Sequence, residues 1–119
     1  MTLAQRQSLV AGWLFLTSIV CFSAELNKFD SLVQAVYDLE VTAYCGLTTD
    51  QVISGYRILH ERLVQEGALD RDQIDSARSE GWKAAHAEWQ NRGLGGFRGW
   101  CKNEGQAAAA ALRHHTLVQ

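Results

Sequence analysis

Two arginines lie among four glycines in the stretch RGLGGFRGWC, residues 92–101. A glycine-rich turn that leads into a helix exposes backbone N–H groups, which bind carboxylates or phosphates. Arg92 and Arg98 would add positive charge to such a site. However, Arg98 occupies the third glycine position of GxGxxG, and no Gly-Lys-Ser/Thr follows. We therefore expect a corner between two helices, with anion binding as the alternative.

Aromatic side chains follow a helical spacing just before this stretch. Trp82, His86 and Trp89 are separated by four and three residues, which places them on one side of a helix. The main expectation is that these rings pack in the core. The alternative is a partly open groove that binds a small apolar ligand or a partner helix. Its lining would be Trp82, His86, Trp89, Arg98 and Trp100.

Histidines and carboxylates are the next candidates for chemistry. HERLV begins like a zinc-protease helix, but Val64 stands where the second histidine of HExxH belongs. Two helices could share a metal ion through His60, His86, Glu61 and Glu88. Boundary positions between core and solvent are the simpler interpretation of these histidines. No serine and histidine show a triad spacing, so we expect no catalytic residue. We also expect no metal and no cofactor.

The first 23 residues differ from the rest of the chain. Arg6 is followed by an uncharged run from Ser8 to Ala24, a pattern typical of a secretory signal peptide. Cleavage after Ser23 would leave a single domain of residues 24–119. The alternatives are a membrane anchor over residues 8–24 that faces the periplasm, at the short limit of a bilayer span, and an internal core helix. We predict an exported protein, periplasmic or secreted.

Export would leave two cysteines, Cys45 and Cys101. Two thiols in a small exported domain most simply form one disulfide, with two buried free thiols as the alternative. The disulfide would close a loop of about 57 residues and stabilise the fold by roughly 4 kcal/mol in the chain-entropy model.

Apolar periodicity predicts that four helices position these side chains. The first covers residues 25–45 and ends at Gly46. The second begins at a capping box of Thr48 and Gln51 and ends near Gly67. The third covers about 70–92 and begins at a second capping box. The fourth begins somewhere in residues 96–100. Small residues at Ala77, Gly81 and Ala85 would let a neighbouring helix approach the third one closely.

Composition excludes several classes of partner. The chain has 119 residues, no proline and a formal net charge of −2, with no block of lysine and arginine. It therefore lacks the electrostatic footprint of a nucleic-acid-binding protein. No sustained alternation indicates strands, so we predict an all-α, compact antiparallel bundle of about four helices with one disulfide. The leading hypothesis is a non-catalytic accessory protein that binds a protein partner or self-associates. The alternative is a periplasmic protein that binds a small ligand or metal near Trp82, His86, Trp89 and Trp100.

Overall fold

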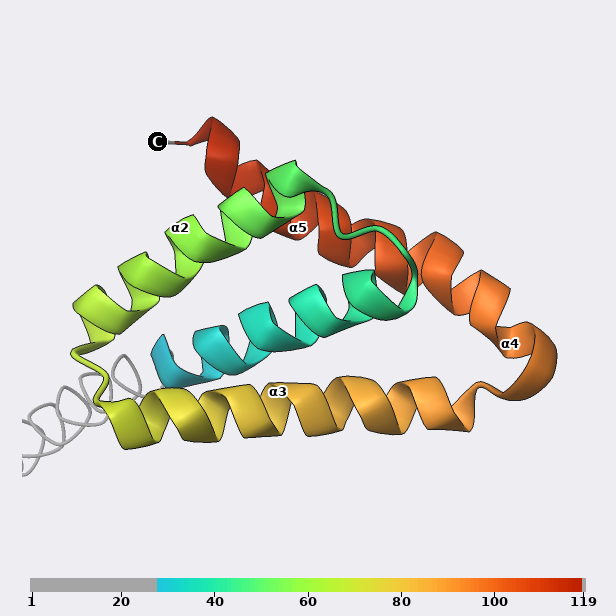
Figure 1. Ribbon diagram of the computed structural model, residues 1–119, viewed down its shortest axis with the longest axis horizontal. Coiled ribbons are helices and arrows are strands. Elements are labelled where there is room, and N and C mark those ends of the chain that lie inside the picture. Colours follow the sequence, from blue (N-terminus) through green and yellow to red (C-terminus); the bar gives the residue numbers. More distant parts are fainter. Residues whose placement is uncertain (1–27, 119) are drawn as a thin grey trace, which may run out of the picture.

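The computed structural model describes residues 28–118, and every regular element in that range is helical. A first helix over residues 28–44 is followed by α2 (Asp50–Gly67), α3 (Arg71–Asn91), α4 (Gly93–Trp100), the π-helical turn η1 (Cys101–Gly105) and α5 (Gln106–Leu117). Helical backbone angles continue through both junctions of η1, so α4, η1 and α5 form one continuous helix. Consecutive helices reverse direction (Figure 1). The predicted all-α antiparallel bundle of about four helices is confirmed.

The predicted signal peptide, residues 1–23, lies outside the described residues, and so does the alternative anchor over residues 8–24. Both stay predictions, as does the domain boundary at residue 24. Within residues 28–118, no helix has the length and apolar character needed to cross a bilayer.

Local signals in the sequence account for most helix ends. Gly46 has a φ of +67°, the left-handed conformation expected of the residue that closes the first helix. Asp70 and Gln73 form the predicted capping box of α3, with backbone-to-side-chain hydrogen bonds of 2.9 Å in both directions. These two ends depend on a few neighbouring residues, which is why the sequence indicates them.

The start of α2 differs from the prediction by one residue. Thr49 is the N-cap, and its side chain accepts a hydrogen bond from the backbone N of Val52 at 3.3 Å. The predicted capping box of Thr48 and Gln51 is therefore wrong. Thr48 Oγ1 instead lies 3.1 Å from Thr42 Oγ1, and Gln51 donates to a side chain on α5. Tertiary partners thus engage both side chains of the expected local motif.

The fourth helix begins at Gly93, earlier than the predicted start in residues 96–100. Arg92 alone forms the corner after α3, and its backbone N–H donates to the carbonyl of Trp89 at 3.3 Å. Each glycine in a helix interior costs about 1 kcal/mol relative to alanine. Tertiary packing must offset that cost. At the end of α4 this packing comes from Trp100, which is only 3 % exposed.

Small residues bring the helix backbones close together at two places. Ala77, Gly81 and Ala85 are buried along α3, as predicted. A Cβ added at Gly81 would lie 2.7 Å from the carbonyl oxygen of Val33 on the 28–44 helix. At the crossing of α2 and α5 (Figure 1), a Cβ at Gly55 would lie only 1.8 Å from the carbonyl oxygen of Leu112. Only glycine permits this second contact.

Cys45 and Cys101 form the predicted disulfide, with their Cα atoms 5.3 Å apart. The bond connects the chain just after the 28–44 helix to the first residue of η1, and the cysteines are 56 positions apart. Both cysteines pack against a buried cluster that contains Val41, Ala85 and Trp100. The disulfide therefore joins two distant segments of the sequence at one part of the core.

Candidate functional site

Four rings stack along one side of α3 and form what we call the aromatic ladder: Tyr44, Trp82, His86 and Trp89. The Trp82 and His86 rings are nearly parallel, with centroids 4.9 Å apart, and the His86 and Trp89 centroids are 5.8 Å apart. Tyr44 reaches across from the 28–44 helix and stacks on Trp89 at 5.2 Å. The structure thus brings together three of the predicted groove residues and adds Tyr44.

The two indoles of the ladder are largely open to solvent. Trp82 is 46 % exposed and Trp89 is 39 % exposed. Their orientation is nevertheless constrained, because His86 stacks on both and its Nδ1 lies 3.1 Å from the Tyr44 hydroxyl. The ladder is therefore an accessible surface of stacked rings, and the main expectation that these rings lie in the core does not describe Trp82 and Trp89.

Trp100 lies in the core behind the ladder, with only 3 % of its surface exposed. Its Nε1 donates to Glu88 Oε2 at 3.3 Å, and the Tyr37 hydroxyl donates to the same oxygen. Burial raises the pKa of Tyr37, and the hydrogen bond to Glu88 raises it further. The Arg92 guanidinium lies 5.7 Å from the centroid of the Trp100 ring. Trp100 thus supports the site from the core side and is not a contact surface.

Arg98 is exposed on α4. Among the described residues, the stacking and hydrogen bonds of the ladder do not include it. The predicted group of Trp82, His86, Trp89, Arg98 and Trp100 is thus divided into a surface ladder, a buried tryptophan and a separate arginine. The glycine-rich stretch is itself helical from Gly93 onward, so the corner predicted for the whole stretch is confined to Arg92.

Two of the four residues considered for a metal site, His86 and Glu88, make other contacts. His86 faces Tyr44, and Glu88 accepts from Tyr37 and Trp100. In the part of the chain that the structure describes, no group of three or more His, Cys, Asp or Glu side chains is placed to hold a metal ion. The geometry consequently offers no support for a metal shared between α2 and α3 through His60 and Glu61.

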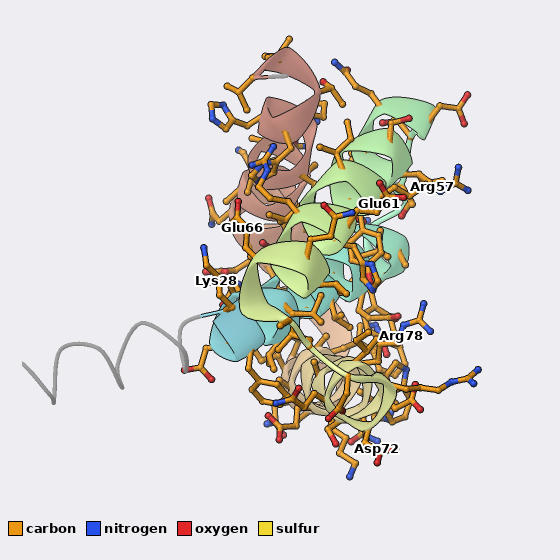
Figure 2. All side chains as sticks on the ribbon, turned by 90° about the vertical axis from the view of Figure 1, so that its left-hand side faces the viewer. Lys28, Arg57, Glu61, Glu66, Asp72 and Arg78 are labelled. Carbon is orange, nitrogen blue, oxygen red and sulfur yellow. A yellow bond between two sulfur atoms is a disulfide. The ribbon has the colours of Figure 1, made fainter. Side chains whose placement is uncertain are left out.

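Sequence reasoning missed a second feature, an open cavity of about 330 Å³ beside α2. Its lining comes from the 28–44 helix, α2 and α3, and consists of Leu39, Ile53, Tyr56, Arg57, His60, Glu61 and Arg78. Figure 2 shows the labelled Arg57, Glu61 and Arg78 on one side of the molecule, away from the Lys28–Glu66 ion pair. The spacing of residues 57, 60 and 61 along one helix face was the signal available in the sequence.

The cavity differs chemically from the ladder. Burial lowers the pKa of His60, and the positive charge of Arg78 lowers it further. His60 Nε2 is shielded from solvent and has no hydrogen-bond partner among residues 28–118. Burial raises the pKa of Tyr56, although a hydrogen bond to Arg78 opposes the shift. Near neutral pH the cavity therefore holds two guanidinium groups, one carboxylate and a neutral imidazole.

No protein-family model, curated protein or solved structure significantly matches this chain.

Proposed function

We propose that this protein is a non-enzymatic accessory protein that binds a segment of another protein on its aromatic ladder. The observation that carries the proposal is the pair of exposed indoles, Trp82 at 46 % and Trp89 at 39 %, fixed by stacking on His86. Tryptophan is among the residues that contribute most to binding at protein interfaces. Rings that are already ordered lose less conformational entropy when a partner binds.

The chemistry around the ladder favours a partner segment with an apolar side chain next to a cationic one. Burial raises the pKa of Tyr44, and the negative charge of Glu40, one helical turn before it, raises this pKa further. Glu40 therefore acts on the ladder, and among residues 28–118 it has no ion-pair partner. Indole faces attract cations, as Arg92 over Trp100 illustrates. We therefore propose that a lysine or arginine of the partner contacts an indole, and that Glu40 adds a favourable negative charge near Tyr44.

The disulfide supports an oxidising location for this activity. Disulfides persist in the periplasm and outside the cell, and the reducing cytosol disfavours them. With the apolar N-terminal run, this supports export of the protein after cleavage near Ser23. N-terminal sequencing of protein from its native host tests the idea, since a mature chain would begin near residue 24. A retained Met1 or Thr2 would contradict cleavage.

Site-specific photocrosslinking in the native host tests the binding face. A photoreactive side chain would replace Ser79, an exposed residue three positions before Trp82, and as a control Ala110, exposed on α5. We expect a heterologous adduct from position 79 and none from position 110. The Trp82→Ala/Trp89→Ala double variant should lose the adduct, and Glu40→Gln should weaken it.

Each other outcome counts against the proposal. An adduct that persists in the double tryptophan variant would show that the ladder is not the binding face. Equal adducts from positions 79 and 110 would indicate unspecific capture. An adduct with the mass of two copies of this chain would replace the proposed partner by self-association. Circular dichroism of the double variant must show retained helix for the comparison to hold.

A further inference from the structure

The cavity beside α2 combines an apolar wall with positive charge. Leu39, Ile53 and Tyr56 are among the residues that line it, and most of its lining surface is apolar. Arg57 and Arg78 lie at its border on α2 and α3 (Figure 2). Its volume of about 330 Å³ is at the lower end of the range for small-molecule sites.

The charged side chains of the lining are not committed to ion pairs in the described part of the chain. Among residues 28–118, neither Arg57 nor Arg78 has an ion-pair partner, whereas Lys28 and Glu66 pair at 2.7 Å on the other side. Glu61 is the one carboxylate in the lining, and His60 has a lowered pKa, so it adds no charge near neutral pH. The lining itself thus carries two guanidinium groups and one carboxylate, and Glu40, whose charge acts on Tyr56, lies outside it.

A hydrogen-bonding group of the lining is also uncommitted. His60 Nε2 has no partner among the described residues although protein atoms shield it from water. Buried polar atoms in folded proteins are normally paired, so this one is an unmet hydrogen-bonding group beside the cavity. The His60 and Tyr56 rings are tilted by 47° to each other with centroids 5.7 Å apart, and both belong to the cavity lining.

We propose that this cavity binds a small organic carboxylate whose apolar body lies on Leu39, Ile53 and Tyr56 and whose carboxylate contacts Arg57 and Arg78. Guanidinium groups match a carboxylate in shape and charge, and the apolar wall would exclude a bare inorganic anion. This site is separate from the aromatic ladder and does not depend on the proposed protein partner.

Titration of phenylacetate into the ¹⁵N-labelled full-length protein, followed by NMR, tests the proposal. For a ligand of this size we expect a Kd on the order of 1 mM, with shifts concentrated at Ile53, Tyr56 and His60. Neutral phenylacetamide tests the charge, and acetate tests the apolar body. Both should bind at least about tenfold more weakly, because a tenfold change corresponds to the loss of one modest interaction.

Arginine variants make the test specific. Arg78→Gln and Arg57→Gln should each raise the Kd of phenylacetate at least about fivefold, the effect of one lost charged contact. Arg98→Gln removes the same charge from α4 and should leave the Kd within about twofold, since salt screens distant charges. Trp89→Ala should also leave it unchanged, which separates this site from the ladder.

Several results would overturn the carboxylate site. Equal affinity for phenylacetate and phenylacetamide would remove the role of the arginines, and equal affinity for acetate would remove that of the apolar wall. Shifts that never saturate, or that map away from the cavity, would show that it is not a ligand site. Retained amide dispersion in both glutamine variants establishes that they fold. Weaker binding of phenylacetate in the Arg98→Gln control alone would also refute the assignment.

Discussion

At the residue scale, the half-buried carboxyl of Asp38 on the first helix makes the stability of the protein depend on pH. Burial raises the pKa of Asp38 from 3.8 to about 6, against the opposing hydrogen bond that Gln34 donates to it at 3.0 Å. The folded state therefore holds the Asp38 proton more tightly than the unfolded chain. Stability from this group is present at low pH and is lost as the pH rises from about 4 to 6.

Asp38→Asn should accordingly stabilise the protein above pH 6 and have little effect below the unfolded pKa of 3.8. The full shift corresponds to about 3 kcal/mol, and solvent screening at this partly exposed carboxyl reduces the expected gain to about 1 kcal/mol. Urea unfolding at several pH values measures it. Asp30→Asn, which removes an exposed carboxylate from the same helix, controls for net charge. A gain that is independent of pH would contradict the assigned cause.

At the scale of elements, backbone approach at helix crossings decides the packing. Gly55 is buried where α2 meets α5, and a Cβ there would overlap the Leu112 carbonyl oxygen at 1.8 Å. Backbone atoms cannot move aside as a flexible side chain can. The two helices must separate or shift if this position carries a larger residue.

Gly55→Ala should therefore destabilise the protein by about 3 kcal/mol, at the upper end of typical overpacking costs. Gly99→Ala is the matched control, since a Cβ at Gly99 has no heavy atom within 4 Å in the described structure. This second change should stabilise α4 by about 0.5–1 kcal/mol through helix propensity. Thermal unfolding of both variants gives the comparison. Equal effects of the two substitutions would argue against a close crossing at Gly55.

At the scale of the whole molecule, one covalent bond connects distant parts of the chain. The Cys45–Cys101 disulfide spans 56 positions and joins the region after the first helix to the long final helix. A small bundle has a limited core, so constraint of its unfolded chain contributes a large share of its stability.

The free energy of unfolding of the Cys45→Ser/Cys101→Ser double variant should be about 4 kcal/mol lower than that of the oxidised protein. Reductant should lower the denaturant midpoint of unfolding of the wild-type protein toward that of the variant. It should leave the midpoint of the variant unchanged. Chemical unfolding with and without reductant measures both effects. A wild-type midpoint that does not respond to complete reduction would show that the bond adds nothing to stability.

The sequence by itself determined the features that depend on neighbouring residues. Apolar periodicity, the Asp70–Gln73 capping box and Gly46 indicated four helices and their main ends, because these signals act within a turn or two. The two cysteines left by the predicted cleavage indicated the disulfide. Spacing alone also indicated that Trp82, His86 and Trp89 lie on the same side of a helix.

Only the tertiary structure decided which of those residues face solvent and which neighbours they meet. Tyr44 joins the ladder from another helix, whereas Trp100 turns into the core. Thr49 replaces Thr48 as a cap because Thr48 finds a partner in Thr42. Arg57 and Arg78 meet at one cavity although 21 positions separate them in the sequence. Such contacts depend on how whole helices pack, and no pattern within a single helix specifies that geometry.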